Sequence, residues 1–181
     1  MAVFDLSNPE QFDQLDWKIL QNGAVSLYLD PNILEADCTW FRDRNYREYR
    51  FDGTAWLTRE DFYTAMDQQL TLPYSSGNLD TLRDLLMDLE VPHESGTIFV
   101  FWRFDLFTRR FTKDTYNILN VMEEISRGFL LTGQRFIVLV QSNDPKITFD
   151  PVGAHPVILN PTENIRHMRH TLKKVNGEKN V

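Results

Sequence analysis

"TIFVFW", residues 97–102, is an almost uninterrupted apolar run. A strand that faces water on one side alternates apolar and polar residues, so this run predicts a strand buried on both faces. "RFIVLVQ", residues 135–141, has the same character, and "AVSLYL", residues 24–29, is a third apolar segment rich in strand-forming residues. Strands of this kind are typical of parallel sheets that helices cover on both sides.

Helical segments separate these strands. The predicted helices begin at Asp30, Thr58, Asn78 and Thr112, and each start has a capping residue or a proline-bearing first turn or precedes a run of helical periodicity. The first is expected to end near Asn45 and the third before Pro92. "YREYRF", residues 46–51, predicts another strand, and residues 104–111 are expected to be a connecting loop. This alternation predicts an α/β fold with a mainly parallel sheet and right-handed crossovers.

The two ends of the chain follow a different pattern. The first twenty residues lack clear periodicity. "KITFDPVGAHPVIL", residues 146–159, looks like one or two short strands broken by turns. Asn160-Pro161-Thr162-Glu163 has the order of a capping box, which predicts a last helix.

The composition limits the possible functions. The 181 residues carry 26 acidic and 19 basic side chains, a net charge of −7. Nucleic-acid binding needs clustered Lys and Arg, so an acidic chain suits a basic protein partner better. Cys38 is the single cysteine, which excludes an internal disulfide. Because we find neither a secretory signal nor a membrane span of roughly 20 apolar residues, we expect a cytoplasmic protein.

The helix after Asn78 has two contrasting faces. Its leucines cover one continuous arc: Leu79, Leu82, Leu85, Leu86 and Leu89. Asp80, Asp84 and Asp88 recur once per turn on roughly the opposite side, and each like-charge pair costs an isolated helix about 0.2–0.5 kcal/mol. One interpretation is a solvated charged face, in which Arg83 relieves the repulsion. The other is a binding surface for a cationic site on another molecule.

The residues around this helix carry a family resemblance. "LPYSSGNLDTLRDLL", residues 72–86, resembles the enzyme-binding segment of the barstar family, intracellular inhibitors of the ribonuclease barnase. The matching positions are Leu72-Pro73, Tyr74, Gly77, Asn78-Leu79-Asp80 and Asp84. The order of strands and helices agrees over roughly residues 46–142. The resemblance implies a three-layer barstar-like fold with a small, mainly parallel sheet, extended by an N-terminal strand–helix unit (residues 1–45) and a C-terminal segment of short strands and a helix (residues 143–181).

The resemblance also implies a function. A loop and helix would plug the basic active site of an extracellular or toxin-type ribonuclease, with no chemistry performed and no cofactor, in a protein expected to be a monomer. Asp84 would occupy the phosphate-binding position, and Glu124 would contribute from the neighbouring helix. The partner-binding residues implied are Tyr74, Asn78, Leu79, Asp80, Arg83, Asp84, Asp88 and Glu124. There are two departures: Arg83 stands where the family often has an aromatic residue, and Met87, Asp88 and Leu89 replace a glycine-rich helix exit.

Two other functions stay open at this point. Asp80, Asp84 and Glu124 could bind a divalent metal in a hydrolase, although no familiar ligand spacing accompanies them. Alternatively, the barstar-like part is only a scaffold, and its two flanking segments bind a partner that is not a ribonuclease. His167 and His170, three residues apart, could hold a metal but are more typical of a solvated face.

Overall fold

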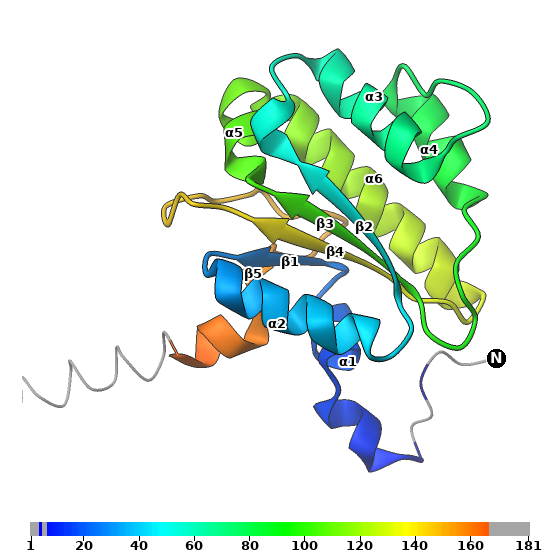
Figure 1. Cartoon of the computed structure of the whole chain (residues 1–181). Coiled ribbons are helices and arrows are strands. Elements are labelled where there is room, and N and C mark those ends of the chain that lie inside the picture. The colour runs from blue at the N-terminus through cyan, green and yellow to red at the C-terminus, as the bar shows by residue number, and fades with distance from the viewer. Residues whose placement is uncertain (1–3, 5–6, 167–181) are drawn as a thin grey trace, which may run out of the picture.

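A parallel sheet runs through the part of the chain that the computed structural model describes, residue 4 and residues 7–166. Its strands are β1 (Val25–Tyr28), β2 (Arg47–Asp52), β3 (Thr97–Trp102), β4 (Phe136–Gln141) and β5 (Ile158–Leu159). They lie in the order β2-β3-β4-β1-β5, and every neighbouring pair is parallel (Figure 1). The α/β fold is therefore confirmed, with a sheet that is wholly rather than mainly parallel.

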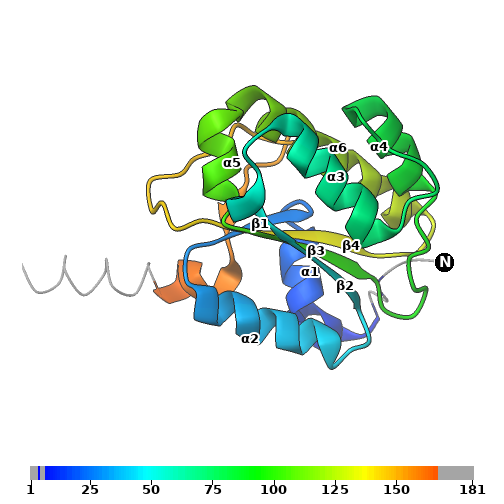
Figure 2. The same cartoon turned by 45° about the horizontal axis from the view of Figure 1, so that its top comes forward.

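Helices cover both faces of this sheet, which gives three layers (Figures 1 and 2). One face carries α1 (Leu15–Leu20) and α2 (Pro31–Arg42), and the other carries α3 (Arg59–Leu70), α4 (Leu79–Met87), α5 (Phe104–Arg110) and α6 (Thr112–Leu131). Two short 3-10 helices, η1 (Pro9–Asp13) and η2 (Gly53–Ala55), lie before α1 and after β2.

The apolar run in β3 supplies both cores of the molecule. Phe99 and Phe101 point into the core under α3 to α6, whereas Ile98 and Val100 point into the core under α1 and α2. All four side chains are buried. Because successive side chains of a strand point to opposite faces, a strand covered on both sides has no position left for a polar residue.

The helix starts agree with the sequence, but one helix is shorter than expected. Asp30 caps α2 by accepting a hydrogen bond from the backbone N–H of Asn32, and Thr58 caps α3 in a capping box. α2 ends at Arg42 rather than near Asn45. Asn45 has a φ of 60°, in the left-handed region, so the chain has already turned toward β2 there.

The prediction that residues 104–111 form a loop is wrong. They form α5, which Phe104 and Phe107 hold against the core one turn apart, with both side chains fully buried. Arg103, with a φ of 51°, makes the sharp turn from β3 into this helix. A helix of seven residues shows too few turns for its periodicity to be recognised in a sequence.

The N-terminal segment is built into the same sheet. β1 lies between β4 and β5, with Val25 paired to Val138 and Ser26 paired to Ile158. α1 is fixed by Asp16, whose buried carboxylate accepts a 2.6 Å hydrogen bond from the hydroxyl of Tyr46. Residues 1–45 therefore supply a central strand to the sheet that residues 46–142 also form.

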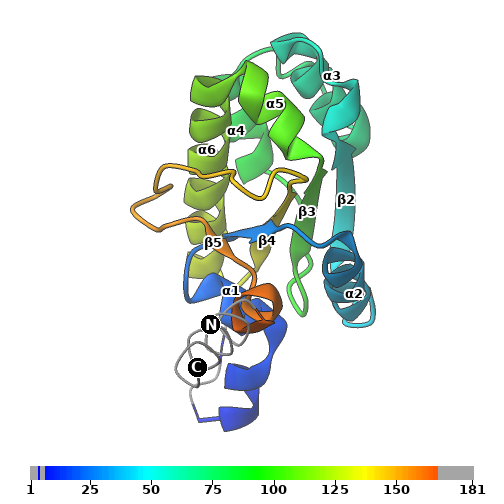
Figure 3. The ribbon, with the colours of Figure 1, turned by 90° about the vertical axis from the view of Figure 1, so that its left-hand side faces the viewer.

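The C-terminal segment crosses α6 before it reaches the sheet edge (Figure 3). Its loop is held by Gly153, whose N–H donates to Asn120 Oδ1 (2.8 Å) and whose carbonyl accepts from Arg127 (2.9 Å). The short strands expected in residues 146–159 are reduced to β5 and an isolated bridge between Val152 and His155.

The last predicted helix starts where the sequence indicates and is described over residues 161–166. The N–H of Glu163 donates to Asn160 Oδ1 (3.0 Å), which is one half of a capping box. The other half is absent because the N–H of Asn160 donates to the carbonyl of Leu27. The Glu163 carboxylate instead accepts from the N–H groups of Leu29 and Asp30 and so joins this helix to the end of β1.

Candidate partner-binding site

α4 turns its leucines inward and its carboxylates outward. The buried or half-buried leucines of this helix and its exit are Leu79, Leu82, Leu85, Leu86 and Leu89. Asp80 and Asp84 are exposed, and 73% of the Asp84 side-chain surface is accessible. Asp88 directly follows the last helical residue and is also exposed. The packing of the leucines thus fixes the direction in which the aspartates point.

The loop before α4 ends at a well-defined helix start. Asn78 Oδ1 accepts a hydrogen bond from the N–H of Thr81 (2.9 Å), as a capping residue should. Gly77 has a φ of +57°, a conformation that glycine adopts without strain. Tyr74, with 60% of its surface exposed, is presented to solvent on this loop.

Asp67, on α3, anchors the same loop. Its carboxylate accepts hydrogen bonds from the hydroxyls of Ser75 (2.8 Å) and Ser76 (2.6 Å) and from the backbone N–H of Ser76 (3.0 Å). Ser76 is buried, so these bonds satisfy groups that water does not reach. The loop that carries Tyr74 is therefore held in place by a neighbouring helix.

Asp67→Ala should destabilise the protein. The buried N–H and hydroxyl of Ser76 would lose their acceptor, and each such group costs about 1–3 kcal/mol. We expect the free energy of unfolding in urea to fall by about 2–3 kcal/mol, while Gln68→Ala, an exposed neighbour on α3, leaves it nearly unchanged. Equal stability of the two variants would contradict the anchoring role.

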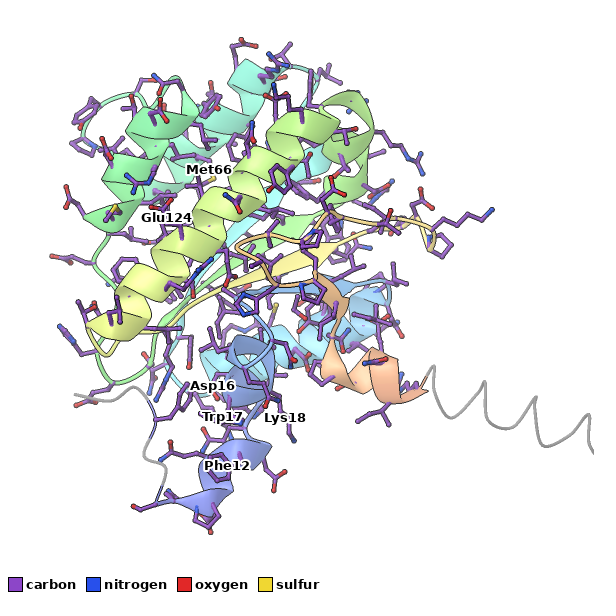
Figure 4. All side chains as sticks on the ribbon, turned by 180° about the vertical axis from the view of Figure 1, so that it is seen from behind. Phe12, Asp16, Trp17, Lys18, Met66 and Glu124 are labelled. Atoms are coloured by element: carbon purple, nitrogen blue, oxygen red, sulfur yellow. The ribbon has the colours of Figure 1, made fainter. Side chains whose placement is uncertain are left out.

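Arg83 and Glu124 join α4 to α6. The Nε of Arg83 lies 3.1 Å from both carboxylate oxygens of Glu124, and its Nη2 also donates to Glu124. Its Nη1 is 3.4 Å from Asp84 Oδ1, a weaker contact. Figure 4 shows Glu124 where α6 adjoins α4. The structure thus brings Arg83, Asp84 and Glu124 together and leaves Asp80 and Asp84 exposed rather than buried against this chain's own arginines.

The Arg83 guanidinium, by hydrogen bonding, holds the pKa of Glu124 below its usual range. Removing the cation should therefore raise that pKa. We expect Arg83→Gln to move the pKa of Glu124 upward toward an ordinary glutamate value in an NMR titration of the side-chain carboxyl carbons. Arg83→Lys keeps the charge and should retain part of the lowering; a pKa of Glu124 unchanged in Arg83→Gln would show that the ion pair does not form in solution.

The arrangement of these elements matches a known family. The family model described as Barstar (barnase inhibitor) matches residues 46–141, slightly more than half of the chain. This chain belongs to the barstar family. The match runs from β2 to β4 and includes the loop, α4 and Glu124. No curated protein matches the chain.

Barstar-family membership places the chain among inhibitors, which bind an enzyme rather than act as one. The segments outside the match, with β1, α2 and β5, extend the sheet and cover its second face. None of the helices in the described ranges combines the length and apolar composition needed to cross a membrane.

The metal-dependent hydrolase receives no support from the side-chain arrangement. Within the described residues, no three His, Cys, Asp or Glu side chains are placed so that they could hold a metal ion. Glu124, which that hypothesis needs as a ligand, is engaged by Arg83. His167 and His170 lie outside the described residues. Cys38 is buried, and burial raises the pKa of its thiol to about 12, so it is a core residue and a poor nucleophile.

Two residues of the site have no signal in the sequence. Asp67 belongs to a helix that ends before the loop, and nothing in its spacing indicates that it folds back onto Ser75 and Ser76. The pairing of Arg83 with Glu124 joins residues on two helices separated by β3, so only the fold brings them into contact.

Proposed function

We propose that this chain inhibits a ribonuclease by inserting the loop of residues 71–77 and the outer face of α4 into the enzyme's basic active site. The observation that carries the proposal is the row of exposed carboxylates on α4, held on a helix whose opposite face is buried. Inhibition would be steric and electrostatic, because the inhibitor covers the substrate site and supplies anions where RNA phosphates bind.

The inhibitory surface is well ordered before it meets a partner. The Asn78 cap, the Asp67 anchor and the buried leucines restrict the loop and α4. A surface that is already in its bound conformation loses less conformational entropy on association. Rigid presentation of anions therefore supports a role as a preformed plug.

Charge supports the same partner class. A net charge of −7 attracts a basic protein over a distance and favours rapid association. The complex of barnase with its inhibitor is itself the reference case for this steering effect. Rapid capture would suit an immunity protein that acts in the cytoplasm of a cell that also makes the ribonuclease.

Individual roles follow from the family resemblance. Asp84 would occupy the phosphate-binding position, Asp80 would meet a second cationic group, and Tyr74 and Asn78 would flank them. Asp88 would add charge at the helix exit, and Leu79 would support the surface from its half-buried position. Arg83 and Glu124 would border the surface, where their mutual pairing lowers the charge they offer to the enzyme.

The test is inhibition of RNA cleavage. Purified chain, added in equimolar and excess amounts to barnase, should stop cleavage of a fluorogenic RNA substrate, and co-expression should rescue growth of cells that produce barnase. Asp43→Ala, a charge change on the opposite face of the sheet, should inhibit as well as the wild type. Undiminished cleavage by barnase and by a panel of secreted bacterial ribonucleases would refute the proposal.

A further inference from the structure

A hollow lies along α6 beside the exit of α4. Its first part, about 240 Å³, is lined by Met87, Ile125, Gly128, Phe129, Thr132 and Gln134. The second part, about 430 Å³, shares Met87, Ile125 and Gly128 and continues to Glu124 and Arg127. The two parts form one groove, which we call the Gly128 groove.

The Gly128 groove has an apolar floor and apolar edges. Ile125 and Phe129 are buried and form part of the floor. Met87, which is 52% exposed, and Leu131, which is 87% exposed, flank it. Large apolar side chains exposed together around a hollow are typical of a protein-binding surface.

Gly128 itself has no internal structural reason to be a glycine. It lies inside the twenty-residue helix α6, where glycine is less favourable than alanine. A Cβ at this position would meet no atom within 4 Å, so the space around it does not require a glycine. The missing side chain does have one effect: it leaves the groove open between Met87 and α6.

The groove is continuous with the acidic surface. Glu124 lines it one turn before Gly128, and Met87 immediately precedes Asp88. Any protein that covers Asp84 and Glu124 therefore reaches the groove as well. A second copy of this chain is a poor occupant, because both copies would bring a net charge of −7 and the same carboxylates to the contact.

We infer that the Gly128 groove receives an apolar side chain of the ribonuclease, adjacent to the basic groups that meet Asp84 and Asp88. This inference rests on the proposed function. It gives a role to the helix exit at Met87, Asp88 and Leu89, where this chain departs from the family pattern. It also predicts a partner whose basic site is bordered by an exposed apolar residue.

The test fills the groove without disturbing the fold. Gly128→Leu places a side chain in open space and raises helix propensity, so the variant should unfold at the same or a higher urea concentration than the wild type. Gly128→Ala makes the same backbone change with a much smaller side chain. With barnase as the probe in titration calorimetry, we expect Gly128→Leu to weaken binding by about tenfold or more and Gly128→Ala to bind as the wild type does.

The outcomes separate the two proposals. If Gly128→Leu binds barnase as tightly as the wild type while Asp84→Ala does not bind, the groove is not part of the interface and the inhibitor function stands. If the wild-type chain does not bind, both proposals fail for barnase. If the chain sediments as a dimer that Gly128→Leu dissociates, the groove is a self-association site and this inference is overturned.

Discussion

Asp84→Ala is expected to weaken the complex with a barnase-type ribonuclease by at least about 30-fold, because removing one member of a buried interfacial charge pair costs about 2–5 kcal/mol. Measurements on the barnase complex itself contribute to that scale, so the magnitude is carried over from it. The loss has a simple cause: the enzyme's cations would be buried without the carboxylate that compensates them. Calorimetry with purified barnase measures the change.

The same substitution should leave folding nearly intact. Asp84 is largely exposed, and its only close charged neighbour among the contacts described is Arg83, at 3.4 Å. Replacing it also relieves repulsion with Asp80 and Asp88. Asp43→Ala, on the opposite face of the sheet, is the matched control. A collapse of thermal stability in Asp84→Ala with binding retained would reverse the assignment of this residue.

Removing the flanking segments should have the largest effect on stability. The side chains of Ile98, Val100, Ile137 and Leu139 are buried in the core under α1 and α2. At about 1.5–3 kcal/mol each, exposing them forfeits roughly 6–12 kcal/mol, which is comparable to the whole net stability of a domain, about 5–15 kcal/mol. The loss of β1 would also leave the edge of β4 unpaired.

We therefore expect a fragment of residues 46–142 to aggregate on size-exclusion chromatography and to lack a cooperative urea transition. The whole chain, under the same conditions, should be monomeric and unfold cooperatively. A monomeric fragment with a sharp transition would mean that the barstar-like part is an independent domain. If the expected result holds, the hypothesis that the flanks bind a partner must be tested with point variants and not by truncation.

The sequence predicts the sheet better than it predicts the site. β1, β3 and β4 are visible as apolar runs because strands buried on both faces leave little room for polar residues. The starts of α2, α3 and α4 are visible because Asp30, Thr58 and Asn78 bond to nearby backbone groups. These signals are local, so they do not depend on the rest of the fold.

Interactions between distant residues escape this approach. Glu163 looks like a capping residue and in fact binds the end of β1. α5 depends on the burial of Phe104 and Phe107, which only the assembled core reveals. The exposed aspartates of α4 could be predicted from the helical period, whereas the pairing of Arg83 with Glu124 could not, because it needs the relative position of two helices.

The place of β1 in the sheet has a consequence for biosynthesis. Val25 and Ser26 leave the ribosome long before their partners Val138 and Ile158, so the N-terminal strand must wait unpaired while the rest of the chain is translated. Native contacts between residues so far apart raise the contact order and slow folding. During that delay, the nascent chain exposes an apolar strand, and a trigger-factor-type chaperone would be well placed to protect it.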